Sequence, residues 1–389
     1  MKKGAKSDVE PTVLMFHSVA DYFDPLPWKP IVCSVATFDS YLSHLKKAGF
    51  TTVSLSDYIG FLNGGESLPP KPVVLTFDDG YMDNWVNAFP ILKKYGFKAT
   101  VYVTTDFIDP RDMVRKTLED YWEGKTALED LDWYGYLSWN ELRVMVDSGV
   151  FEVGSHAVTH TWHFSSPEIV DFHRPDDPYV WFEWNRDPAR KPFWMMDERD
   201  GRWGSPVYSF GPALTTRIYR PSQEMEQALT AYVRKEGGTS FFNMKGWRER
   251  LFKFALDIRK DFGDQGDYEG EQQYWSRAKN EVISSKRILE DGLGRKINTL
   301  AWPNDAHNSK LVEFAYEEAH YELTCMVEDC GNEAGEYPWV SRTYIGEKYG
   351  SWMWNNLWFR AKMAATGDDL TASLLKAGLR GRDWVKSLF

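Results

Sequence analysis

Short runs of consecutive hydrophobic residues alternate with longer stretches whose hydrophobic positions recur every three or four residues. The runs are typical of strands buried on both faces, and the stretches are typical of amphipathic helices. We predict strands at residues 12–19, 51–55, 72–77, 98–104 and 151–156. Helices are expected at residues 36–50, 56–65, 84–96 and 138–149, with Ser56 as the N-cap of the second. This alternation indicates βα units around a parallel sheet.

The alternation stops after residue 160 and returns near residue 274. Between these points the chain is rich in Trp, Pro, Gly and charge, and helical periodicity appears only at residues 222–237 and 247–263. Further on we predict helices at residues 274–294, 309–320 and 351–367, and strands at residues 297–302 and 321–327. We therefore expect one barrel-like α/β domain over residues 1–389, with an insertion at residues 161–274.

Composition and charge argue against several partners. The formal net charge is −11, from 46 Lys and Arg against 57 Asp and Glu, which disfavours nucleic acid. No hydrophobic run approaches the ~18 residues of a membrane-spanning helix, and no signal-peptide core follows the basic start. Cys33, Cys325 and Cys330 suit reduced thiols, and no second Cys/His pair makes them a zinc site. We expect a cytoplasmic protein; the sequence does not indicate its oligomeric state.

Candidate chemistry lies where three predicted strands end. Asp78 and Asp79 follow one strand, His156 and His160 follow another, and His17 follows the first. The carboxyl ends of parallel strands meet on one face of a sheet or barrel, so these side chains are expected to lie together. If the chain makes a helical turn, the two histidines face the same way. With one carboxylate they form a metal site that leaves positions open for water and substrate.

Each pattern has a plainer interpretation. An isolated HxxxH arises by chance, adjacent aspartates are usually turn or cap residues, and a lone histidine usually belongs to the core. The joint position of all three at the strand ends of one sheet favours a catalytic metal centre.

The sequences TFDDG (residues 76–80) and SHAVTH (residues 155–160) resemble the motifs of the polysaccharide deacetylases, the NodB-like family of carbohydrate esterases. The resemblance implies a distorted (β/α)7-8 TIM-like barrel that removes acetyl groups from sugars with a divalent metal. Zinc is the expected metal, with cobalt, nickel or manganese as alternatives. Asp78 maps onto the general base, and Asp79, His156 and His160 map onto the metal ligands.

The order of the motifs resembles the circularly permuted members, such as those acting on poly-N-acetylglucosamine. In these the catalytic-acid histidine precedes the first motif, which maps onto His17 in LMFH. LAWPNDAHN (residues 300–308) resembles their third motif. We therefore predict substrate contacts from Tyr81, Trp302, Pro303, Asn304 and Arg342.

This third motif lacks the adjacent arginine that orients the base in the family. Arg342 and Arg220 are the two candidates to replace it.

The expected function is hydrolysis of an N-acetyl group on a sugar, with a carbohydrate that bears an acetamido group as substrate. An amide hydrolase for a non-sugar substrate and an inactive glycan-binding barrel remain alternatives. A phosphatase is disfavoured because FDDGY lacks the alternating Asp-x-Asp pattern. The aromatic residues of the insertion are expected to line the substrate site, or else to pack the insertion onto the barrel.

Overall fold

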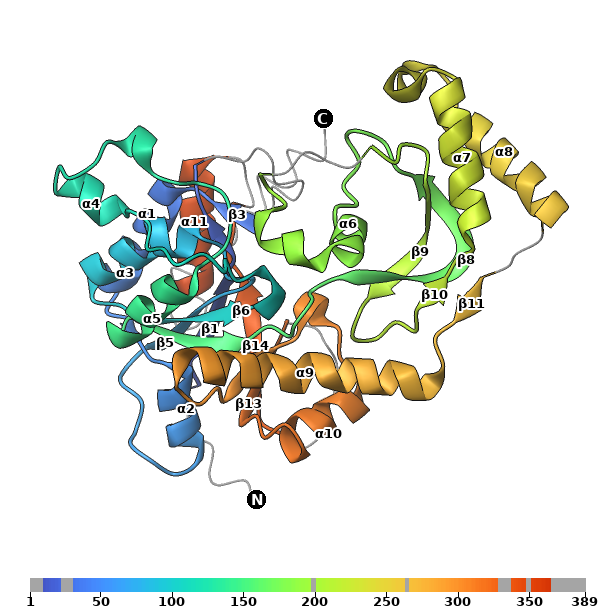
Figure 1. The fold of residues 1–389 in the computed structure, drawn as a ribbon. Helices are drawn as coiled ribbons and strands as arrows, with labels where there is room; N and C mark the ends of the chain where they lie inside the picture. The colour runs from blue at the N-terminus through green and yellow to red at the C-terminus, as the bar shows by residue number, and fades with distance from the viewer. Residues whose placement is uncertain are drawn as a thin grey trace.

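Seven parallel strands of the described chain close into a barrel. The computed structural model describes residues 10–21, 31–196, 201–262, 266–327, 337–347 and 351–364. The strands follow one another around the ring in chain order, and the last pairs with the first. They are β1 (Thr12–Phe16), β5 (Pro72–Phe77), β6 (Ala99–Val103), β7 (Phe151–Ser155), β12 (Thr299–Ala301), β13 (Leu323–Val327) and β14 (Trp339–Tyr344). The predicted (β/α) barrel is confirmed (Figure 1).

A hydrophobic core fills the space between the strands and the outer helices, as the unbroken hydrophobic runs indicate. All six residues of β5 are buried. The rings of Phe16 and Phe77 stack at 5.4 Å, and Phe38 of α1 (Val35–Lys47) packs edge-on against Phe16 at 5.3 Å. Burying rings of this size is a large hydrophobic contribution, so the wall between β1, β5 and α1 anchors the core.

Helices cover the outside of the barrel. They are α1, α2 (Leu55–Leu62), α3 (Phe89–Tyr95), α4 (Leu118–Trp122), α5 (Trp139–Asp147), α9 (Glu271–Leu293), α10 (Ser309–Glu317) and α11 (Trp352–Ala364). The N-cap of α2 is Ser54, so the prediction of Ser56 was wrong. Ser54 Oγ accepts the backbone N–H of Asp57 at 3.0 Å, and the Asp57 carboxylate accepts the N–H of Ser54, a capping box.

Some predicted elements differ from the structure, and one barrel strand was not predicted. The predicted strand at residues 51–55 is only β4 (Thr51–Thr52), which pairs with β5 outside the ring. The predicted helix at residues 84–96 is a π-helical turn, Asn84–Ala88, followed by α3. Strand β14 was not predicted, because the inward-facing Arg342 breaks its hydrophobic pattern.

The chain between β7 and α9 forms a second layer beside the barrel mouth (Figure 1). Its strands β8 (Trp162–Phe172) and β9 (Pro206–Pro212) form an antiparallel ribbon, and β10 (Tyr219–Arg220) pairs with β11 (Asp267–Tyr268). Helix α6 (Trp181–Arg186) lies against the ribbon, whereas α7 (Gln223–Lys235) and α8 (Trp247–Phe262) pack on its far end. The ribbon was not predicted because register shifts near Ile169 interrupt its alternation.

Two predictions about membranes and thiols can be compared with the described residues. None of their helices combines the length and hydropathy that crossing a bilayer requires. Cys33 and Cys325 are buried free thiols, and Cys330 lies outside the described residues.

Candidate active site

A cavity of about 550 Å³ opens at the carboxyl ends of the barrel strands. Asp78 and Asp79 reach it from the end of β5, His156 and His160 from the loop after β7, and His17 from the end of β1. The structure thus brings together all five residues for which the sequence predicts catalysis or metal binding.

Three of these residues converge on one point. Asp79 Oδ1 lies 3.2 Å from Nε2 of His160 and 3.4 Å from Nε2 of His156. Nδ1 of His156 lies 2.8 Å from the carbonyl oxygen of Ala301, so Nδ1 carries the hydrogen and the Nε2 lone pair faces Asp79. Asp79 Oδ1 is buried without a hydrogen-bond donor in the described part of the chain. The two imidazole nitrogens and the carboxylate oxygen converge with their lone pairs, and this arrangement fits a divalent cation.

The electrostatics of these groups also fit a cation. Burial lowers the pKa of His160 to about 4, which keeps this imidazole neutral. Burial alone would raise the pKa of Asp79, but its contacts with His160 and His156 outweigh burial and lower the pKa. Burial would lower the pKa of His156, but Asp78 and Asp79 raise it, so the two carboxylates favour positive charge at this point. Among the described residues, no other cluster of His, Cys, Asp or Glu brings three ligand atoms this close. His163 and Cys325 are therefore not part of the group.

The loop that carries the two histidines is not a helical turn, so their convergence does not come from helical spacing. Ala157 and His160 have positive φ values of 57° and 41°, and Asp79 opposite them has 72°. Left-handed backbone at non-glycine residues costs roughly 1–3 kcal/mol each, so surrounding contacts must hold the loop.

Glu281 of α9 supplies those contacts. Its carboxylate accepts the backbone N–H groups of Val158 at 3.1 Å and Thr159 at 2.9 Å, and the Thr159 hydroxyl at 2.7 Å. From the inserted layer, Lys191 Nζ donates to the carbonyl oxygen of Thr159 at 3.2 Å and pairs with Asp106 at 2.8 Å. Neither Glu281 nor Lys191 was predicted, because a sequence pattern does not show which backbone groups a buried charged side chain will contact.

Asp78 is held by Arg342. The guanidinium of this β14 residue donates from Nη1 to Oδ1 at 2.5 Å and from Nη2 to Oδ2 at 2.8 Å. Burial would raise the pKa of Asp78, but the charges of Arg342 and His156 more than offset it, so the pKa is lowered. Arg220 lies on β10 and pairs with Asp267 at 3.6 Å, so it is not the arginine that contacts Asp78.

His17 lines the same cavity, and burial lowers the pKa of its imidazole. Its backbone is fixed by the π-helical turn that follows the two aspartates. Asn84 Nδ2 donates to the His17 carbonyl oxygen at 2.8 Å. Asp83 accepts hydrogen bonds from the Ser18 hydroxyl at 2.5 Å and from the backbone N–H of Val19 at 3.0 Å. Both partners lie on the short strand β2 (Ser18–Val19), which pairs with β3 (Val32–Cys33). These polar residues were present in the motif region, but the sequence analysis assigned them no role.

The predicted substrate contacts are mostly at the cavity. Tyr81, Trp302, Asn304 and Arg342 line it, whereas Pro303 is buried and does not. Further aromatic residues complete the wall. Phe107 and Tyr136 of the barrel loops were not predicted there, whereas Trp162, Trp181 and Trp184 belong to the insertion, whose aromatic residues were expected either to line the substrate site or to pack on the barrel. The His160 and Trp162 rings lie 5.6 Å apart, so the insertion begins directly beside the histidine group.

Part of the chain is similar to known polysaccharide deacetylases. Residues 65–174, which contain both motifs, match the polysaccharide deacetylase family. The chain is 32% identical over 91 residues to Bacillus subtilis YxkH, a segment covering 23% of this chain and 30% of that protein. It is 31% identical over 120 residues to the poly-beta-1,6-N-acetyl-D-glucosamine N-deacetylase of Escherichia coli, covering 31% of this chain and 16% of that protein. The matches thus span less than a third of either relative.

A solved structure extends the likeness in fold over most of the chain. The de-N-acetylase from Aggregatibacter actinomycetemcomitans superposes with a TM-score of 0.52 at 20% identity, covering 87% of this chain and 96% of the other. The barrel and its motifs thus resemble those of the NodB-like polysaccharide deacetylases. Within that family the chain is similar to the poly-N-acetylglucosamine deacetylases.

Proposed function

We propose that this protein is a metal-dependent hydrolase that removes the acetyl group from an acetamido sugar of a glycan. The convergence of Asp79, His156 and His160 beside the Arg342-held Asp78, in one aromatic-lined cavity, supports this function most directly. The family match and the similarity to a poly-N-acetylglucosamine deacetylase supply the class of substrate.

Asp79, His156 and His160 would hold the metal, with zinc proposed first because imidazole and carboxylate ligands suit it. Bound there, a divalent cation supplies Lewis acidity toward the acetyl carbonyl. Asp78 takes a proton from the water that attacks the carbonyl carbon, and Arg342 keeps this carboxylate ionised and aimed into the cavity.

His17 gives a proton to the sugar nitrogen as the C–N bond breaks, so the products are acetate and a free amine. His17 lies in the same cavity as Asp78, and its lowered pKa makes it a readily dissociating acid once protonated. The rings of Tyr81, Trp162 and Trp181 exclude water and offer faces for a sugar to stack on.

A mass-spectrometric screen for loss of one acetyl group across N-acetyl sugars and their oligomers tests this function. The expected result is acetyl loss from at least one glycan, with none from the Asp78→Asn protein. Glycan binding without acetate release would instead indicate an inactive barrel. Acetate release from a non-sugar amide alone would indicate the other hydrolase.

A further inference from the structure

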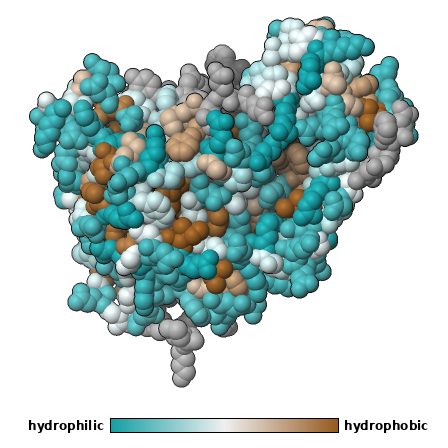
Figure 2. Space-filling model, in the orientation of Figure 1, coloured by the Kyte–Doolittle hydropathy of each residue, from teal (hydrophilic) through white to brown (hydrophobic). Residues whose placement is uncertain are grey.

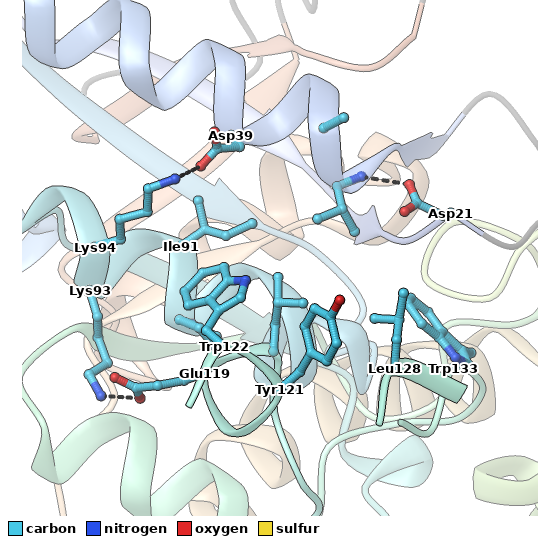
Figure 3. A pocket seen from close by; sticks show the side chains of 14 residues that line it. Asp21, Asp39, Ile91, Lys93, Lys94, Glu119, Tyr121, Trp122, Leu128 and Trp133 are labelled. Atoms are coloured by element: carbon cyan, nitrogen blue, oxygen red, sulfur yellow. Dashed lines mark hydrogen bonds and ion pairs between the residues drawn. The ribbon is translucent and has the colours of Figure 1, made fainter. Parts of the chain in front are cut away.

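A second cavity, of about 730 Å³, lies outside the barrel between α1, α3 and α4 (Figure 3). We call it the aromatic groove, and Tyr121, Trp122, Leu128 and Trp133 line it in one row. Three of these side chains are strongly exposed, Tyr121 at 41%, Trp122 at 47% and Leu128 at 41%. Hydrophobic residues also reach the surface on this side of the molecule in Figure 2. Exposed aromatic rings in a hollow indicate a binding surface.

The rim of the aromatic groove is polar and nearly balanced in charge. Lys94 Nζ pairs with Asp39 at 2.7 Å and lies 5.8 Å from the Trp122 ring centroid. Lys93 pairs with Glu119 on the same rim, and Asp21 lies at the far end (Figure 3). Aromatic ring faces bordered by lysine donors and carboxylate acceptors complement a sugar, because a sugar presents an apolar C–H face and a ring of hydroxyl groups.

The size of the groove also favours a ligand of this kind. Its volume lies within the roughly 300–1,000 Å³ of small-molecule sites, whereas a stable protein interface covers about 800 Å² per partner. A second protein chain would leave the rim ion pairs partly buried, at a desolvation cost that a hydrated sugar avoids.

The groove is close to the catalytic cavity. Ile31 lines the catalytic cavity and Val35, four positions along the chain, lines the aromatic groove. Likewise Tyr136 lines the catalytic cavity and Trp133, three positions before it, lines the aromatic groove. Chain segments of these lengths span at most about 14 Å and about 11 Å, so both cavities lie within reach of one oligosaccharide.

We propose that the aromatic groove binds sugar units of the acetylated glycan other than the one being deacetylated. This inference rests on the proposed function and adds to it a second binding site for the same glycan, on the outside of the barrel. Binding there raises the affinity for long chains by multivalency and leaves the chemical step unchanged.

The test compares chain lengths in Trp122→Ala and Tyr121→Ala proteins, with Trp352→Ala as the matched control. Trp352 is 54% exposed on α11 and lies outside the groove. With long N-acetylglucosamine oligomers, each groove variant should raise KM about threefold to tenfold with kcat unchanged. With the disaccharide, kcat/KM should stay within about twofold of wild type, and Trp352→Ala should change neither. Equal effects on both lengths, or none, would overturn the inference.

Two further measurements separate the groove from the catalytic proposal. Calorimetry should measure the affinity of long oligomers for the Asp78→Asn protein. Adding Trp122→Ala to this protein should weaken that affinity by the same factor by which Trp122→Ala raises KM. If acetate is released but affinity does not depend on Trp122, the groove inference fails alone. If no acetylated glycan releases acetate, the proposed function fails, and the calorimetry still decides the groove. A dimer in size-exclusion chromatography that Trp122→Ala dissociates would make the groove a subunit interface and overturn the inference.

Discussion

Arg342 and Asp78 form a two-point ion pair across the barrel interior, between strands β14 and β5 that flank β1. Both side chains are almost fully buried, at 2% and 4% exposure. The planar guanidinium matches both carboxylate oxygens, so it fixes the direction of Asp78 as well as its charge. In this chain the arginine therefore comes from the last barrel strand rather than from the motif around Pro303.

Replacing Arg342 by Met should reduce kcat on the order of 100-fold while zinc content is retained, because Asp78 loses its orientation but the metal ligands remain. Arg342→Lys should recover only part of the loss, since one ammonium cannot hold both oxygens. The matched control is Arg220→Met on β10, which should behave as wild type. Steady-state kinetics with metal analysis measure all three. Full activity in Arg342→Met would contradict the role given to this pair.

His17→Ala should separate two kinds of substrate. Cleavage of an N-acetyl sugar should fall by about 100-fold or more, because an amine leaves only when it is protonated. Hydrolysis of a nitrophenyl acetate should fall far less, because a phenolate leaves without a proton. Equal losses on both substrates would show that His17 serves binding or folding instead of protonation.

Glu281→Ala should weaken zinc binding by about 10-fold to 100-fold, because the loop of His156 and His160 loses three hydrogen bonds to this carboxylate. Glu271→Ala, at the exposed start of the same helix, is the control and should bind zinc normally. Competition with a chromogenic chelator measures the affinity. Unchanged binding in Glu281→Ala would mean that the loop holds its shape without α9.

Asp83 should make stability depend on pH. Burial raises the pKa of this carboxyl to about 6, against hydrogen bonds from Ser18, Val19 and Asn84 that lower it. A carboxyl whose pKa is higher in the folded state binds its proton more tightly there, so stability falls as pH rises from about 4 to about 6. Relative to Asp83→Asn, the wild type should lose up to about 3 kcal/mol over that range. Denaturant unfolding of both proteins at pH 4 and pH 7 checks this, and parallel pH profiles would contradict it.

The barrel could be predicted because its strands and helices carry strong local patterns. The strands at residues 72–77 and 98–104 are rich in hydrophobic and β-branched residues, and helices such as α5 and α9 show clear periodicity. Strand β14 was not predicted because it lacks a hydrophobic pattern: its buried Arg342 contacts the site residue Asp78 instead of packing in the hydrophobic core. The ribbon of β8 and β9 was not predicted because partial burial and bulges leave it without a regular alternation of hydrophobic and polar residues.

The position of the candidate site could be predicted from the sequence, whereas the residues that support it could not. Motif residues at strand ends identified Asp78, Asp79, His156, His160 and His17. The residues that hold them, Glu281, Lys191 and Asp83, could not be identified, because their partners are brought close only by the fold. In a single sequence, a buried polar residue is visible only as an interruption in the hydrophobic pattern of its helix or strand.

Metal binding by Asp79, His156 and His160 is the central requirement of the proposed deacetylation. The direct measurement is acetate release from N-acetylglucosamine oligomers by metal-depleted protein, before and after stoichiometric zinc is added. We predict no release before and recovery after, with His163→Ala recovering like the wild type and His160→Ala failing to recover. Activity in the metal-depleted protein, or full zinc-dependent activity in His160→Ala, would contradict the account.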